Sequence, residues 1–142
     1  MINDEEMLQF IMRNAEMGCI GINDIKPFAS DTNLRKALRS QNLEYGNIYH
    51  NAYNILKNRG YTPNKVGKFV TKLSAVKTKR EMKSDDSDSH IAQMMIQGNT
   101  MGVQKIAQRI RQYDGNNELV GKLADKLMST EQANIEQMKS YL

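Results

Sequence analysis

Residues 90–106, HIAQMMIQGNTMGVQKI, decide the fold class. Apolar or small residues recur there at every third or fourth position, at Ile91, Met95, Gly98, Gly102 and Ile106. This spacing puts all five residues on one face of an α-helix, whereas the faces of a strand alternate at every second residue. The stretch therefore predicts a helix that packs along one side.

Similar periodic segments cover the rest of the chain, and turn residues separate them. Pro27 ends the first segment, Gly60 ends the second, and the loop 114–117 divides the last two. No segment has the alternation or the Asn-Gly turn that is typical of a β-hairpin. We expect an all-α domain over residues 1–142, with one hairpin over 3–60, a helix over 64–83 and a second hairpin over 87–142. One face of the helix over 64–83 carries five apolar residues, namely Val66, Phe69, Val70, Leu73 and Val76.

The bulk composition indicates one soluble domain in a reducing compartment. The chain has 142 residues, of which 39% are hydrophobic and 25% charged, and this is enough for a core beneath a polar surface. Its single cysteine excludes an internal disulfide. The start has no secretory signal, and no apolar run approaches the ~20 residues that span a bilayer. A cytoplasmic location is therefore expected, with no membrane partner.

A faint internal repeat relates the two predicted hairpins. The segments EMGCIGI (16–22) and TMGVQKI (100–106) share Met-Gly, and EYGNI (44–48) and EQANI (131–135) share a Glu and an Asn three residues apart. Each helical residue adds about 1.5 Å along the helix axis. The two marked segments of a hairpin lie at similar distances from the turn between them, so they should lie at nearly the same level. The helix over 64–83 could then cross about 30 Å between the hairpins. A plain five-helix array is the alternative.

These marks resemble the ferritin-like superfamily. Its pattern is a Glu on the first helix, Glu-x-x-His on the second, Glu on the third and Glu-x-x-His on the fourth. The matching positions in this chain are Glu16, Glu44 with Asn47, Asn99 or Thr100, and Glu131 with Asn134. The run 90–98 also resembles bacterial proteins of this type. The resemblance implies a ferritin-like four-helix bundle of two antiparallel hairpins joined by a helical crossover.

The departures from that pattern indicate a degenerate metal site. Both histidine positions hold Asn, and the carboxylate of the third helix is missing. A di-iron site needs about four carboxylates and two imidazoles. We therefore expect no resident cofactor, and at most one divalent metal ion on Glu16, Glu44 and Glu131.

The glutamates nevertheless occupy positions where a core helix needs apolar residues. Glu131 follows the spacing of Leu127 and Met138, and Glu44 that of Ile48. A buried carboxylate must be hydrogen-bonded, paired, metal-bound or protonated. The favoured interpretation is a polar core network that includes Gln41, Asn47 and Asn134. A bound ion or small ligand, and simple exposure, are the alternatives.

The helix over 64–83 is strongly basic. Its cations are Lys65, Lys68, Lys72, Lys77, Lys79, Arg80 and Lys83, against Glu81 alone. A solvated helix face is the favoured interpretation, so nucleic acid is not expected, although an acidic partner or nucleic acid could meet this face. The Gly98 and Gly102 spacing permits close helix packing or a dimer seam, so a homo-oligomer is an open prediction.

No catalytic signature accompanies these features, because the chain has no phosphate loop, HExxH, CxxC or GxSxG. The sequence therefore favours a non-enzymatic, cytoplasmic binding or assembly protein with a largely lost metal site. One alternative is a carboxylate metal-binding protein that holds a single ion or a weak pair. The second is a binder of nucleic acid or an acidic partner through the basic helix.

Overall fold

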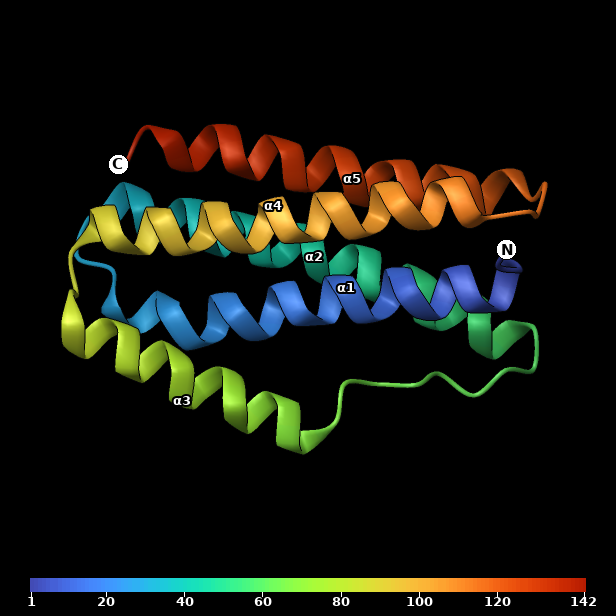
Figure 1. Ribbon diagram of the computed structural model, residues 1–142, viewed down its shortest axis with the longest axis horizontal. Helices are drawn as coiled ribbons and strands as arrows, with labels where there is room; N and C mark the ends of the chain where they lie inside the picture. Colours follow the sequence, from blue (N-terminus) through green and yellow to red (C-terminus); the bar gives the residue numbers. More distant parts are fainter.

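The computed structural model describes residues 1–142 and is all-helical, which confirms the predicted all-α class (Figure 1). No strand forms, and Ile2 makes only an isolated bridge with Tyr113. None of the helices combines the length and hydropathy that a transmembrane span requires. The elements in chain order are α1 (Asp4–Ile25), the 3-10 turn η1 (Lys26–Phe28), α2 (Thr32–Asn58), α3 (Lys68–Ser84), α4 (Asp88–Gln112) and α5 (Glu118–Lys139).

Polar side chains fix where the four long helices begin. Asn3, Asp31, Ser87 and Asn117 each accept a hydrogen bond from a backbone N–H three residues further along. Such caps satisfy amide groups that have no partner inside the helix. Gly60 follows the end of α2 with a φ of +83°, a conformation that favours glycine.

The long helices pack as two antiparallel pairs, α1 with α2 and α4 with α5. The pairs lie against each other, because α5 contacts both α1 and α2, and α4 contacts α1. In Figure 1, α2 and α4 run in the same direction, so the segment between them returns along the whole length of the molecule. One apolar core, drawn from all five α-helices, joins these elements.

The connection between the pairs differs from the continuous helix expected over 64–83. Residues 61–67 are not helical, and α3 begins at Lys68. Three side chains of α1 hold this extended segment by its backbone. Gln9 bonds to Thr62 and Asn64, Arg13 donates to the carbonyls of Asn64 and Lys65, and Glu16 accepts from the Val66 amide. These hydrogen bonds satisfy backbone N–H and C=O groups that would otherwise be paired within a helix.

The packing of α3 also differs from the pattern of its apolar residues. It lies on the outside of the molecule against α1 and buries only Thr78 and Met82. Ser74 of α3 donates a hydrogen bond of 2.8 Å to Asp24 of α1. The apolar residues that the sequence places on one face of this helix remain 40–73% exposed from Phe69 to Val76. The face of α3 that packs therefore carries Ser74, Thr78 and Met82 instead of the apolar residues from Phe69 to Val76.

Glycines at equivalent places in the repeat make room for side chains of the neighbouring helix. A Cβ added to Gly18 would lie 2.6 Å from the ring of Tyr45, and one added to Gly102 would lie 1.9 Å from a carboxylate oxygen of Glu131. Both distances are far shorter than van der Waals contact. Gly21 on α1, in contrast, has nothing within 4 Å of an added Cβ.

This difference predicts opposite effects of two alanine substitutions on α1. Gly18→Ala must displace the buried Tyr45 ring and should lower the free energy of unfolding by about 1–3 kcal/mol. Gly21→Ala meets open space and should raise it by up to about 1 kcal/mol, because alanine favours helix more than glycine does. Urea denaturation followed by circular dichroism measures both. Equal effects of the two substitutions would contradict the proposed close packing at Gly18.

Candidate functional site

Four polar side chains from three helices meet at the centre of the molecule, and we call them the Tyr45 network. The Tyr45 hydroxyl on α2 lies 2.5 Å from Oδ1 of Asn99 on α4 and 2.9 Å from Oε2 of Glu131 on α5. Asn134 donates to the same Asn99 oxygen at 3.3 Å, and Asn99 donates to the Met95 carbonyl at 2.7 Å. The network therefore ties both helix pairs together.

The number of protons in this network favours a neutral Glu131. A tyrosine hydroxyl has one proton, yet two acceptor oxygens lie within hydrogen-bond distance of it. The Asn99 oxygen cannot supply a proton. If the Glu131 carboxyl is protonated, it donates to Tyr45, and Tyr45 in turn donates to Asn99. The Tyr45 hydroxyl, the Asn99 oxygen and Oε2 of Glu131 are then joined in one continuous chain of hydrogen bonds.

The surroundings of Glu131 favour the same neutral form. The side chain is only 2% exposed and lies against the backbone of Gly102. Burial raises the pKa of the Glu131 carboxyl from 4.5 to about 7, against a smaller lowering by the Tyr45 hydrogen bond. Burial, followed by the charge of Glu131, raises the pKa of the Tyr45 hydroxyl above its usual range. The second oxygen of Glu131, Oε1, is buried and has no hydrogen-bond partner.

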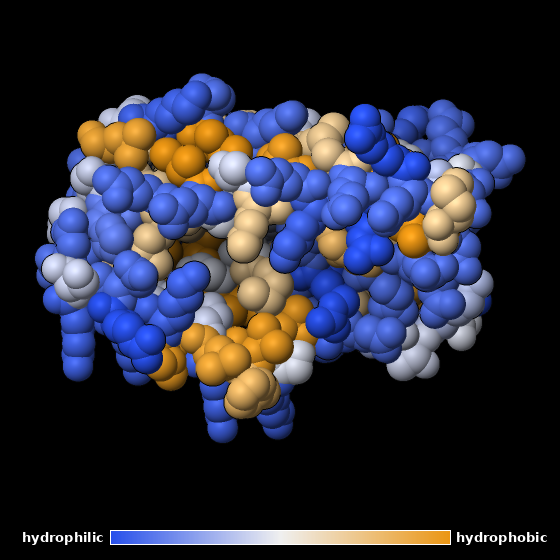
Figure 2. Space-filling model, viewed as in Figure 1, coloured by the Kyte–Doolittle hydropathy of each residue, from blue (hydrophilic) through white to orange (hydrophobic).

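The network forms the inner end of a cavity of about 430 Å³ between α1, α3 and α4. Tyr45, Asn99 and Glu131 are the most deeply buried polar residues in its lining. Half of the lining residues are hydrophobic, and they include four methionines, namely Met17, Met94, Met95 and Met101. The cavity opens above the apolar surface of α3, where Figure 2 shows a hollow.

Glycines on α1 and α4 form part of the cavity wall. Gly18 and Gly21 on α1 and Gly98 and Gly102 on α4 all line it. Gly21 and Gly98 leave open space that larger residues would fill, whereas Tyr45 and Glu131 occupy the space beside Gly18 and Gly102. The Gly98 and Gly102 pair, for which the sequence suggested helix packing or a dimer seam, therefore has divided roles. Gly102 makes room for Glu131, and Gly98 lines the cavity with open space around it.

The structure does not bring the three predicted metal ligands together, so the expected convergence of Glu16, Glu44 and Glu131 is wrong. Glu16 holds the Val66 amide at 2.8 Å. Glu44 is 46% exposed and forms an ion pair with Lys126 at 3.3 Å. Only Glu131 is buried. No group of three or more His, Cys, Asp or Glu side chains in the structure could hold a metal ion.

The predicted polar core network exists in part, with different members. Asn134 belongs to the Tyr45 network, whereas Gln41 is buried apart from it and donates to Gln137 at 2.8 Å. Asn47 is exposed, so its assignment to the core is wrong. Tyr45, next to Glu44, takes the central place. The spacing Gln41, Tyr45, Ile48, with steps of four and three residues, could have identified it.

The raised pKa of Glu131 predicts a pH-dependent stability. In the unfolded chain the carboxyl titrates near 4.5, so the stabilising neutral form is fully present below that pH and is lost as pH rises through about 7. Glu131 alone should lower the free energy of unfolding by roughly 3 kcal/mol across this window. Glu131→Gln cannot ionise and should lack this loss in urea denaturation at acidic and mildly basic pH.

Glu44→Gln is the matched control for that measurement. It makes the same chemical change at a half-exposed glutamate of α2 and should leave the pH dependence of the wild-type chain in place. If Glu131→Gln loses as much stability as the wild-type chain between the two pH values, the neutral form of Glu131 is refuted.

Comparisons with known proteins assign no family to this chain, since no protein-family model, no curated protein and no solved structure matches it. The functional interpretation of the site therefore rests on the geometry and chemistry of this chain's own residues.

Proposed function

We propose that this chain is a small-molecule binding protein whose site is the cavity between α1, α3 and α4. The ligand has a mostly apolar body and a polar end that carries a hydrogen-bond donor, such as a hydroxyl or amide N–H. The observation that carries this proposal is the Oε1 atom of Glu131. It is a buried acceptor without a partner in the protein, on a residue that lines an apolar cavity.

The size and lining of the cavity suit the apolar body. Its volume of about 430 Å³ falls in the range of roughly 300–1,000 Å³ that is typical of small-molecule sites. Methionine side chains are flexible and polarizable, so a lining rich in them adapts to different apolar shapes. This role accounts for part of the high methionine content of the chain.

The inner end of the cavity suits a donor group and disfavours an anion. A buried acceptor without a partner is unfavourable by about 1–3 kcal/mol, which a donor on the ligand would recover. A ligand carboxylate would instead meet the carbonyl-like Oε1 of a neutral Glu131, or the negative charge of an ionised one. Asn99 and Tyr45 are already bonded within the network, which leaves Oε1 of Glu131 as its acceptor without a partner.

The arrangement of the helices supports a ferritin-like bundle as the framework of this site. Two antiparallel pairs joined by a long connection, with α2 parallel to α4, match the topology that the resemblance implies. Asn99, Glu131 and Asn134 then occupy positions that correspond to metal ligands in that superfamily. In this proposal a hydrogen-bonded network has replaced the metal site, and the chain acts as a binding protein in the cytoplasm, without catalysis.

Binding of a phenol and its methyl ether tests the proposed site. Para-butylphenol has an apolar body and one donor, and its methyl ether has the same body without the donor. We expect the phenol to bind roughly tenfold more tightly, because only the phenol can donate to Oε1 of Glu131. Isothermal titration calorimetry measures both dissociation constants.

Two glycine variants provide the controls. Gly98→Leu places a side chain into the cavity from a position with open space, and it should abolish binding without unfolding the chain. Gly121→Leu makes the same change on α5, away from the cavity, and should leave binding unchanged. Binding of both ligands with equal affinity, or binding that survives Gly98→Leu, would overturn the proposed function.

A further inference from the structure

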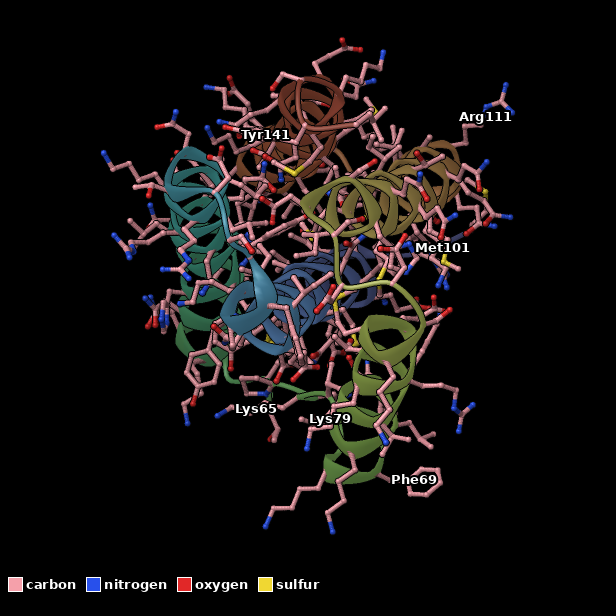
Figure 3. The ribbon with its side chains drawn as sticks, turned by 90° about the vertical axis from the view of Figure 1, so that its left-hand side faces the viewer. Lys65, Phe69, Lys79, Met101, Arg111 and Tyr141 are labelled. Atoms are coloured by element: carbon pink, nitrogen blue, oxygen red, sulfur yellow. The ribbon has the colours of Figure 1, made fainter.

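The outer surface of α3 combines exposed apolar side chains with unpaired positive charge. Phe69, Leu73 and Val76 are 73%, 53% and 52% exposed, and we call them the outer row. Their spacing of four and three residues places them on one face of the helix. Figure 3 shows Phe69 pointing away from the rest of the molecule, and Figure 2 shows the apolar surface that this part of the chain presents.

Positive charge is concentrated around this row. Residues 65–83 contain seven of the 20 Lys and Arg residues of the chain and only one of its 16 acidic residues, so the remainder of the chain carries a small net negative charge. All seven cations are exposed. None of them takes part in an ion pair within the protein, and Glu81, the one acidic residue of this segment, pairs with His90. The charge of this segment is therefore free to meet a partner.

We propose that the outer face of α3 docks on the surface of a bilayer that contains anionic lipid. The outer row would enter the boundary between headgroups and acyl chains, and the lysines around it would contact the anionic headgroups. Exposed apolar side chains that reach the acyl boundary, with lysines beside them that meet anionic headgroups, are the two attractions that hold a peripheral segment on such a bilayer. The absence of a spanning helix does not bear on this mode of contact, which requires only one exposed face.

The charges and side chains favour a bilayer over the other occupants of this face. A second copy of the chain would bring two strongly positive segments together, and the repulsion would oppose association. Nucleic acid would use the cations but would leave Leu73 and Val76 without a role, and only Phe69 could stack on a base. An anionic bilayer uses the apolar row and the cations together, and the aliphatic stems of lysine suit its boundary.

The place of α3 beside the cavity adds a further argument, which rests on the proposed function. Val66 and Val70, next to the outer row, line the cavity. A chain docked through α3 would thus hold its cavity near the apolar layer from which a mostly apolar ligand is drawn. The docking surface itself does not depend on whether the cavity is occupied.

Vesicle sedimentation with the full chain tests this proposal. At low salt the chain should sediment with vesicles of phosphatidylcholine mixed with phosphatidylglycerol, and at least tenfold less with phosphatidylcholine alone. High salt should weaken the binding, because headgroup attraction is screened. Phe69→Ser with Leu73→Ser should lower the affinity at least tenfold through lost apolar burial. Lys72→Gln, Lys77→Gln and Arg80→Gln together should lower it about a hundredfold.

Matched variants elsewhere on the surface separate docking by α3 from general adhesion. Leu43→Ser with Leu119→Ser removes two leucines that are 67% and 55% exposed on α2 and α5. Lys36→Gln, Arg39→Gln and Lys57→Gln together remove three exposed cations of α2. Both control sets should retain wild-type binding. Circular dichroism should show that all four variants are folded, since each removes only exposed side chains.

Several outcomes would overturn the proposal. The chain would not sediment with mixed vesicles at low salt, or the control variants would lose as much vesicle affinity as the α3 variants. Retention on an oligonucleotide without vesicle binding, or a dimer in analytical ultracentrifugation that the Phe69 and Leu73 changes dissociate, would also contradict it. Para-butylphenol titration is read independently. If the chain binds vesicles but not para-butylphenol, the cavity function alone is refuted. If it binds para-butylphenol but not vesicles, the docking surface alone is refuted.

Discussion

The rest of this structure depends on the hydrogen bond between the Tyr45 hydroxyl and the Glu131 carboxyl. It joins α2 of the first helix pair to α5 of the second, at the centre of the molecule. Apolar contacts tolerate small slides of one helix along another, but a buried carboxyl without its partner is strongly unfavourable. The bond therefore specifies how the two pairs are aligned. It also explains why Gly18 and Gly102 stand at equivalent places, since one accommodates the tyrosine ring and the other the carboxyl group.

The same glycines connect the packing of the helices with the cavity. The close approach of Tyr45 to α1 and of Glu131 to α4 requires residues without side chains on both helices. Gly21 and Gly98, on the same two helices, leave open space that forms part of the cavity. A chain that buried larger side chains there would have a fuller core and no site. The polar network and the apolar cavity are thus two results of one packing arrangement.

The sequence predicted the helices well because each long helix has a clear apolar period and a capping side chain at its start. It failed at residues 64–67, which were expected to begin the helix over 64–83 but are held in an extended form by α1 side chains that bind their backbone. Such bonds depend on residues about fifty positions away, so local pattern cannot reveal them. The exposure of the outer row could not be predicted for a related reason. Its spacing indicates a helix but does not tell whether the neighbouring helix or solvent faces it.

The site was predicted only in part, and the difference is one helical position. Glu131 and Asn134 lie inside as their spacing indicates, but on α2 the buried residue is Tyr45, and its neighbour Glu44 is turned about 100° away toward Lys126. The repeat of Glu and Asn in the two hairpins suggested equivalent roles for Glu44 and Glu131. A neutral buried carboxyl needs a partner that accepts its proton, and the tyrosine hydroxyl accepts it while donating its own proton to Asn99.

The weak attachment of α3 has a consequence for how a molecule would reach the cavity. This helix contributes part of the cavity wall, yet it touches mainly α1 and buries only two of its side chains. The free energy needed to open a segment with few buried apolar contacts is a small fraction of the free energy of global unfolding. The wall can therefore detach and return while the two long helix pairs remain folded. Because the cavity already opens at the surface beside α3, this local opening would widen an existing entrance and so admit bulkier guests.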